Sequence, residues 1–238
     1  LRIQPIVTAM FMNSPWYEGQ HRGRLGERPD VWLHMDPERT GLLPFAWMSG
    51  AKYRDYVSWA LRAPMFLIVR DGQVVHNTGQ RFEEFLADGY QGARATRLDW
   101  ETHLNTLFPE VRLKRTLEWR GADNQRRDLV CALPALARGV LYDPVALDRA
   151  EALASQLEYE DVLAHRVDIT RRGLRAVLGG RAVGEWADEL LTIAEEGLDR
   201  LDVRDAYGRT ERLHLLPLRA LVDAGACPQQ PTTVIDLT

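Results

Sequence analysis

The residues best suited to chemistry lie in the segment FPEVRLKRTLEWRGAD, residues 108–123. Between residues 111 and 120 apolar and polar side chains alternate, which is typical of a β-strand with one face in a core. The polar positions hold one carboxylate and several cations, among them Glu118, Arg112, Lys114 and Arg120. A carboxylate is a hard oxygen ligand for a divalent metal, and the arginine fork matches a phosphate. The pattern suits a strand that binds a metal and an anionic ligand. On spacing alone, however, it slightly favours an edge strand protected by its charges.

The same segment resembles the corresponding part of the glutamate–cysteine ligases of the plant and proteobacterial type. Its pattern E-x-R-x-x-D, formed by Glu118, Arg120 and Asp123, resembles one found across the wider glutamate–cysteine ligase superfamily. The resemblance implies that Glu118 is a ligand of Mg²⁺. It also implies that Arg120 contacts the phosphates of ATP and has the catalytic role of stabilising charge on the transferring phosphoryl group. Lys114, on the same polar face, is assigned with Arg120 to ATP binding.

A second segment, ERPDVWLHMDPERTG, resembles the R-x-x-x-W and D-P-x-R-T-G elements of the same family. The resemblance implies that Arg28 binds the α-carboxylate of glutamate and that Trp32 and Arg39 shape or close the substrate pocket. An arginine suits this task because its fork can hold a carboxylate through two hydrogen bonds. The alternative is that both arginines form surface salt bridges with neighbouring acids, namely Glu27, Asp36 or Glu38.

Phe66 occupies a position at which the family often has a tyrosine, after the pair Pro64-Met65. If that hydroxyl contacts substrate in relatives, its loss puts recognition of the acceptor amine in doubt. Phe66 is therefore kept as a candidate substrate-binding residue, and a core aromatic at the start of a strand is the alternative.

Other chemistry is poorly supported. His103 lies beside Glu101, but no second histidine stands at metal-ligand spacing. The chain has neither a GxSxG nucleophile motif nor a GxxxxGK[ST] phosphate loop. ATP, if bound, is bound by another architecture.

Composition limits the partners. The 238 residues carry a net charge of −4 with a pI near 5.9, which gives no electrostatic case for binding nucleic acid or an anionic membrane. No apolar run approaches the ~20 residues that span a bilayer, and the start, LRIQPIVTAM, does not have the pattern of a signal peptide. Cys131 and Cys227 are expected to be small buried hydrophobes in a reducing cytoplasm. The paired cysteines of plant relatives align near Asn77 and Gly92, so a disulfide switch is not expected.

The spacing of apolar residues predicts the elements of the first half. Residues 3–11 form a helix with one buried stripe and Pro5 in its first turn, and residues 16–44 form a long loop. A helix covers residues 53–61, a hairpin turns at Asp71-Gly72, and a short helix begins near Phe82.

The second half reads as helical. Asp143 is expected to cap a helix that has Pro144 at its first position. Apolar residues recur at helical spacing over 145–167 and 183–199, with Glu195 and Glu196 on a solvated face. Residues 229–238 are expected to fray.

The resemblance implies an α+β fold in which helices flank an antiparallel β-sheet funnel, similar to the catalytic fold of glutamine synthetase. Residues 1–145 would be the C-terminal part of the ligase catalytic domain, and residues 146–238 a helical scaffold packed on the sheet, within the same domain. The chain begins with Leu1 and aligns with the C-terminal half of the family, so we expect a fragment that binds ATP–Mg²⁺ poorly and makes no product alone.

The activity that the resemblance implies is ligation of L-glutamate to the amine of L-cysteine through γ-glutamyl phosphate, at the expense of ATP. Two alternatives remain open. The parent enzyme could join glutamate to another amine, or the chain could be a non-catalytic half that binds glutamate or a partner protein. The sequence does not give the oligomeric state.

Overall fold

The computed structural model describes residues 1–229, and the chain divides into two compact units. The first unit consists of Trp32–Arg120 with Leu1, and the second joins Arg2–Val31 to the chain from Gly121 onward. Helices and short two-stranded sheets are both present, which confirms the α+β class. The units do not follow the expected division at residue 145, so the roles expected for residues 1–145 and 146–238 stay predictions. In the described part of the chain, every helix is too short or too polar to cross a membrane.

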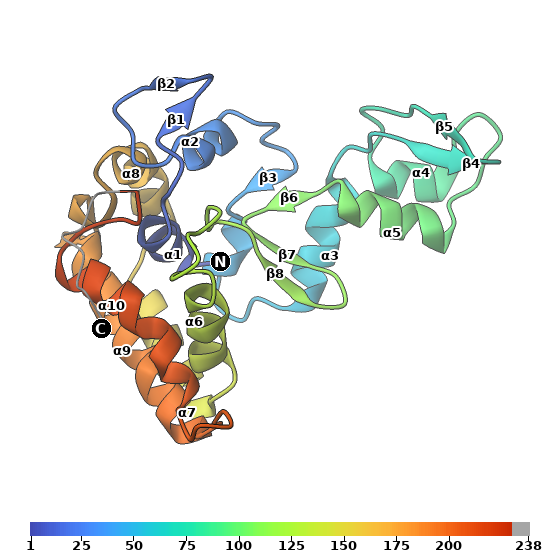
Figure 1. Cartoon of the computed structure of the whole chain (residues 1–238). Helices are drawn as coiled ribbons and strands as arrows, with labels where there is room; N and C mark the ends of the chain where they lie inside the picture. The colour runs from blue at the N-terminus through green and yellow to red at the C-terminus, as the bar shows by residue number, and fades with distance from the viewer. Residues whose placement is uncertain (230–238) are drawn as a thin grey trace. The chain divides into compact units, whose positions relative to one another are not determined.

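The first unit is built from short elements (Figure 1). Its helix α4 packs against α3, and α5 packs against the hairpin formed by β4 and β5. The elements are β3 (Thr40–Gly41), the 3₁₀ helix η1 (Pro44–Trp47), α3 (Tyr53–Arg62), β4 (Ile68–Arg70), β5 (Gln73–Val75), α4 (Phe82–Asp88), α5 (Arg97–Asn105), β6 (Phe108–Pro109), β7 (Val111–Leu113) and β8 (Leu117–Trp119).

The predicted hairpin at Asp71-Gly72 is confirmed by the antiparallel pairing of β4 with β5. Asp71 has φ +50° and Gly72 has φ +74°, so both central residues of the turn are left-handed. Turns of this kind match the twist of the strands they join, and Asp-Gly is among their preferred sequences. The helices predicted at 53–61 and near Phe82 are also confirmed.

The prediction of one strand over residues 111–120 is wrong, because the chain folds back on itself. β7 and β8 form an antiparallel hairpin in which Arg112 lies opposite Glu118. The three-residue loop 114–116 keeps odd residues on one face, so a single strand and a hairpin produce the same alternation. The apolar face is not in a core along its whole length, since Val111 is buried but Leu117 is 57% exposed.

The second unit is mainly helical (Figure 1). Helix α2 begins in this unit and ends in the first. Its elements are α1 (Gln4–Met10), β1 (Trp16–Tyr17), β2 (Gln20–His21), α2 (Glu27–Leu33), α6 (Ala132–Leu141), α7 (Pro144–Ala154), α8 (Tyr159–Arg172), η2 (Gly173–Arg175), β9 (Val177–Leu178), β10 (Arg181–Ala182), α9 (Val183–Leu201), η3 (Glu211–Leu215) and α10 (Leu216–Asp223).

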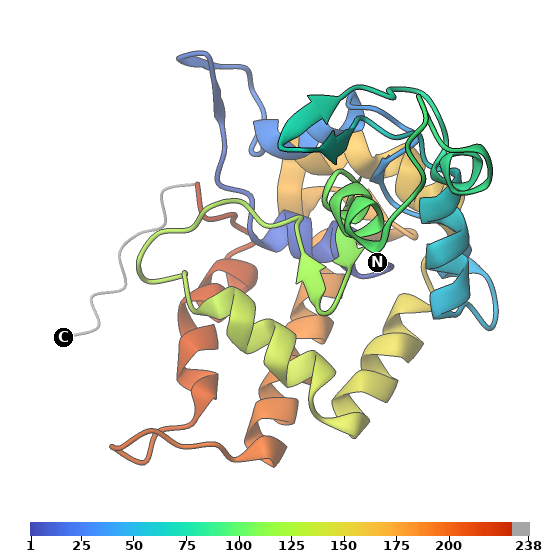
Figure 2. The same ribbon diagram turned by 90° about the vertical axis from the view of Figure 1, so that its right-hand side faces the viewer.

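Helix α9 is the centre of this unit and contacts α1, α6, α7 and α10. Figure 2 shows the yellow-green α6 running into the yellow α7 through a tight bend. Asp143 lies in that bend and accepts a hydrogen bond from the backbone N–H of Ala146 at 2.8 Å, which confirms the predicted cap. Where α6 meets α9, a Cβ atom on Gly139 would overlap the carbonyl oxygen of Ala194, so only glycine allows this approach.

Four expectations are corrected in the second unit. Every residue of α1 is buried, not a single stripe, because α8 and α9 both pack against the helix. The expected loop 16–44 contains the helix α2, and the expected helix 145–167 is broken between α7 and α8. Glu195 is buried, since Arg219 and Arg212 compensate its charge at 3.0 and 3.4 Å.

Cys227 is buried as expected, but Cys131 is exposed and the prediction for it is wrong. The fraying expected over 229–238 lies outside the described residues, apart from the first of them.

Candidate functional site

The β7–β8 hairpin brings together the carboxylate and the guanidinium that the sequence singled out. Arg120 follows β8 directly, and its Nη1 donates to Oε1 of Glu118. The chain also adds Arg112, whose Nε donates to Oε2 of Glu118 at 2.9 Å and whose Nη2 donates to Oε1 at 3.1 Å. The three side chains form one cluster, which we call the Arg–Glu–Arg cluster.

The ionised form of Glu118 is favoured in this cluster. Partial burial of the carboxyl raises its pKa, but the hydrogen bonds and charges of Arg112 and Arg120 lower it by more. The net pKa of Glu118 therefore lies below its ordinary value, and the group is a carboxylate at neutral pH.

Two aromatic rings lie near the guanidinium of Arg120. Its Cζ lies 5.3 Å from the ring centre of Trp32 and 5.7 Å from that of Phe108. These distances fall within the range in which a cation is attracted to the face of a ring. Trp32, expected in the substrate pocket, therefore contacts the predicted ATP-binding arginine. Lys114, by contrast, is exposed, and its Nζ donates to Oδ1 of Asn105 at 2.8 Å.

Arg39 and Phe66 also lie together in the first unit. The guanidinium of Arg39 stacks 3.4 Å above the centre of the Phe66 ring, and its Nε donates to Asp36 at 2.6 Å. The salt bridge considered as an alternative for Arg39 therefore exists. However, Arg39 is only 2% exposed, so it is not a surface ion pair. A role for Arg39 and Phe66 in shaping a pocket stays a prediction.

Arg28 belongs to the second unit, where its side chain lies close to Gly121 and Asp123. Its Nη1 donates to the carbonyl of Gly121 at 3.2 Å and lies 3.7 Å from Oδ1 of Asp123. The other oxygen of Asp123 accepts from Ser14 Oγ and from the backbone N–H of Asn13, both at 2.7 Å. Asp123, the last residue of the E-x-R-x-x-D pattern, thus joins the start of α2 to the segment after the hairpin.

The surroundings of Glu118 do not fit a magnesium site. Mg²⁺ needs oxygen ligands in near-octahedral geometry, and both oxygens of Glu118 are taken by arginines. Among the residues that the structure describes, no three His, Cys, Asp or Glu side chains are grouped so as to hold a metal. The prediction that Glu118 is a metal ligand is therefore not supported by the site's geometry.

His103 has a structural role, as the sequence favoured. It is buried, its Nε2 lies 2.8 Å from the carbonyl oxygen of Ala60, and its ring stacks on Phe82. Burial lowers its pKa, with a further contribution from the charge of Arg39, so the ring is neutral at neutral pH. The sequence analysis placed Arg112 on the polar face but did not predict its contact with Glu118.

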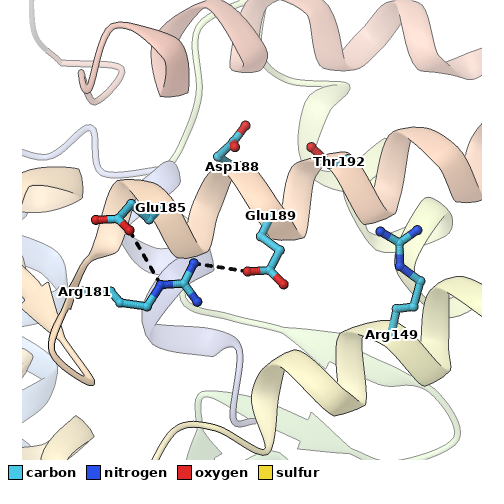
Figure 3. Close-up of a pocket in the computed structure, with 6 residues that line it drawn as sticks. All are labelled: Arg149, Arg181, Glu185, Asp188, Glu189 and Thr192. Atoms are coloured by element: carbon cyan, nitrogen blue, oxygen red, sulfur yellow. Dashed lines mark hydrogen bonds and ion pairs between the residues drawn. The ribbon is translucent and has the colours of Figure 1, made fainter.

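A hollow of about 420 Å³ lies on the surface of α9 in the second unit. Figure 3 shows Arg181 directed toward Glu185 and Glu189, at 3.7 and 3.1 Å. Arg149 at the other side forms an ion pair with Glu196. The two arginines that line the hollow are therefore paired with neighbouring glutamates. None of the predicted site residues lines the hollow.

Comparison with known proteins identifies relatives of this chain. Residues 1–235 match the model of glutamate-cysteine ligase family 2 (GCS2). The glutamate–cysteine ligase, chloroplastic, of Medicago truncatula is 39% identical over 87% of this chain and 41% of its own length. The same-named protein of Brassica juncea is 40% identical over 84% of this chain and 40% of its own. Glutamate–cysteine ligase A, chloroplastic, of Oryza sativa subsp. indica is 36% identical over 97% of this chain and 46% of its own length.

Two consequences follow from these relatives. The chain spans less than half the length of the curated relatives it matches. The cytoplasmic location expected from the cysteines is corrected, because these relatives are all named as chloroplast proteins. A low cysteine content indicates a reducing compartment but does not say which one. The sequence resemblance is confirmed by the match over residues 1–235: the chain belongs to glutamate-cysteine ligase family 2.

Proposed function

We propose that this chain contributes a phosphate-binding hairpin and part of the glutamate site to an ATP-dependent glutamate–cysteine ligase. The Arg–Glu–Arg cluster is the observation that carries the proposal, and family membership over residues 1–235 supports it. The product is γ-glutamylcysteine, the first intermediate of glutathione biosynthesis. We further propose that the antiparallel hairpins β4–β5 and β7–β8 belong to a sheet funnel in the complete catalytic domain.

The proposed reaction has two steps. The γ-carboxylate of glutamate attacks the γ-phosphate of ATP, which forms γ-glutamyl phosphate and releases ADP. The amine of cysteine then attacks the acyl carbon and displaces phosphate. Phosphoryl transfer of this kind needs little covalent help from protein, and its rate depends on positioning and on neutralising charge. The magnesium ion that accompanies ATP neutralises part of that charge.

Each proposed role follows from the chemistry of one side chain. Arg120 donates hydrogen bonds to oxygens of the transferring phosphoryl group, because a guanidinium keeps its charge and matches phosphate geometry. Arg28, whose side chain is about one-third exposed, binds the α-carboxylate of glutamate. Trp32, Arg39 and Phe66 shape the walls around the substrates, and Lys114 adds positive charge for ATP.

The test uses a chimera in which this chain replaces the equivalent part of the Brassica juncea relative, because the chain alone is expected to make no product. The chimera should form γ-glutamylcysteine from ATP, glutamate and cysteine, measured by mass spectrometry. Arg120→Ala should lower kcat by about 100-fold or more. Arg28→Ala should mainly raise KM for glutamate. Arg115→Ala, an exposed arginine in the same hairpin, is the matched control.

A folded chimera that makes no γ-glutamylcysteine would contradict the proposal. Product from the isolated chain would contradict the narrower expectation that this chain is inactive alone. The acceptor is tested separately, because Phe66 offers no hydroxyl to a substrate. A panel of amines compared with cysteine, using Phe66→Tyr as the second variant, shows whether another acceptor is preferred.

A further inference from the structure

The carboxylate of Glu118 accepts hydrogen bonds from two guanidinium groups, and these contacts indicate its role in the site. We infer that Glu118 is a positioning residue, held by Arg112 and in turn orienting Arg120, and that it is not a ligand of Mg²⁺. The inference deepens the proposed function, because Arg120 is taken there as the phosphate-binding group. It also gives Arg112 a role, which neither the sequence pattern nor the relatives' names suggest.

The first argument is occupancy of the carboxylate. Arg112 donates to both oxygens of Glu118, from Nε at 2.9 Å and from Nη2 at 3.1 Å. Arg120 donates to one of these oxygens as well. A carboxylate accepts about four hydrogen bonds in all, so three donors use most of its capacity. A magnesium ion bound to Glu118 would have to share the carboxylate with both arginines.

The second argument is charge. The cluster holds two positive guanidinium groups and one negative carboxylate, a sum of +1. Arginine does not lose its proton in proteins, so the sum cannot be relieved by titration of Arg112 or Arg120. A divalent cation approaching this group meets net repulsion, whereas an oxyanion such as a phosphate is attracted. The cluster therefore selects an anion.

The third argument is the rigidity of the chain of contacts. Nη1 of Arg112 donates to the carbonyl oxygens of Asn105 and Leu107 at 2.9 and 3.4 Å, which ties its guanidinium to the end of α5. Its side chain is only 12% exposed. Glu118 contacts both arginines and so links the fixed Arg112 to Arg120. The ring centres of Trp32 and Phe108 also lie 5.3 and 5.7 Å from Cζ of Arg120. Donors fixed before the substrate arrives stabilise developing charge most effectively.

The experiment first measures Arg120 without any ligand. Exchange of its Nη protons with water, which include the donor to Glu118, is followed by ¹⁵N NMR in the full chain. Glu118→Gln and Arg112→Gln should each accelerate the exchange by about 10-fold or more, and the double variant should be no faster than either. Arg115→Gln, the exposed neighbour, should leave the rate unchanged. Unchanged exchange in both single variants, with the fold retained, would overturn the inference.

Magnesium is then titrated alone into the wild type and the two variants. We expect no change in the NMR signal of the Glu118 carboxylate carbon. Magnesium binding that persists in Arg112→Gln but is lost in Glu118→Gln would overturn the inference and restore the metal role. If the glutamine variants do not fold, Arg112→Lys keeps the charge but loses the paired hydrogen bonds, and it should show the same faster exchange.

Tripolyphosphate, titrated in the presence of EDTA, separates this inference from the proposed function. Its affinity for the wild type should fall about 10-fold in Glu118→Gln and in Arg112→Gln. Absence of tripolyphosphate binding by a wild type that still protects Arg120 would contradict the phosphate role of Arg120 and leave its positioning intact. Normal tripolyphosphate binding by a wild type whose Arg120 protons exchange rapidly would contradict the positioning by Glu118 and leave the phosphate role of Arg120 intact.

Discussion

The ionisation of Glu118 is linked to folding, because its neighbours differ between the folded and unfolded states. Partial burial acts to raise its pKa, but Arg112 and Arg120 lower it by more, so the folded pKa lies below the unfolded value of about 4.3. Where the pH lies between these two values, the unfolded chain binds more protons and stability rises with pH. The contribution of Glu118 is therefore complete above about pH 4.3 and is lost as the pH falls through the folded pKa.

We predict that Glu118→Gln lowers the free energy of unfolding at about pH 6 and has a much smaller effect at about pH 3. Glutamine keeps the shape of the side chain and removes the titrating charge. Urea unfolding of both proteins at each pH measures the difference. The free energy of unfolding of Arg112→Gln should likewise approach that of the wild type at low pH. An equal difference between variant and wild type at both pH values would contradict the linkage.

At the scale of elements, α5 is held at its first turn by one buried carboxylate. Asp99 accepts from both terminal nitrogens of Arg70, at 2.7 and 2.8 Å. It also accepts from the backbone N–H and the hydroxyl of Thr96, while Thr96 accepts from the N–H of Asp99. This reciprocal cap satisfies donors at the start of α5, and the arginine fixes the helix to the end of β4.

Asp99→Ala should therefore lower the free energy of unfolding by about 2–4 kcal/mol, since it removes a cap and leaves Arg70 without its carboxylate. Urea unfolding at neutral pH measures the loss. Glu101→Ala is the matched control in the same helix, because its pair with Arg97 is exposed and should be worth less than about 1 kcal/mol. Equal losses in the two variants would argue against the role of the cap.

The contact between α6 and α9 depends on two glycines, one on each helix. A Cβ on Gly139 would overlap Ala194, and one on Gly197 would overlap the carbonyl oxygen of Gly139. In an exposed helix, replacing glycine by alanine stabilises by about 1 kcal/mol. We predict the opposite effect at this contact: Gly139→Ala should destabilise the protein and lower its melting temperature. The reference change Ala152→Gly, on the exposed face of α7, should lower the free energy of unfolding by only about 1 kcal/mol.

These elements also show what the sequence could predict. The β4–β5 hairpin was predictable because Asp-Gly specifies its turn locally. The turn at 114–116, sequence KRT, has no glycine, proline or asparagine, so the pairing of Arg112 with Glu118 had no local signal. The burial of Glu195 depends on Arg219, which lies on another helix, and helical spacing within α9 does not contain that information.

For the whole molecule, the two cysteines report on folding differently. Cys131 is exposed, whereas Cys227 is buried and donates to the carbonyl oxygen of Ala9 at 3.3 Å. Burial raises the pKa of the Cys227 thiol to about 11, so little of it is thiolate at neutral pH.

We predict that a thiol reagent labels one equivalent in the native protein and a second only on unfolding. Cys131→Ser should abolish the fast phase, and Cys227→Ser should leave it intact. Mass spectrometry identifies the labelled peptide. Rapid native labelling of Cys227 would show that the contact between α1 and the segment after α10 opens without unfolding.

The second unit is discontinuous in sequence, and this affects how the chain is made. Helix α1 leaves the ribosome before the stretch Trp32–Arg120, and every one of its residues is buried in the finished protein. Its neighbour α9 begins only at Val183, after the whole first unit has been synthesised. The uninterrupted stretch Trp32–Arg120 can therefore fold during translation while α1 still has no α9 to pack against. Holding chaperones would bind the nascent protein at that helix and leave once α9 has emerged.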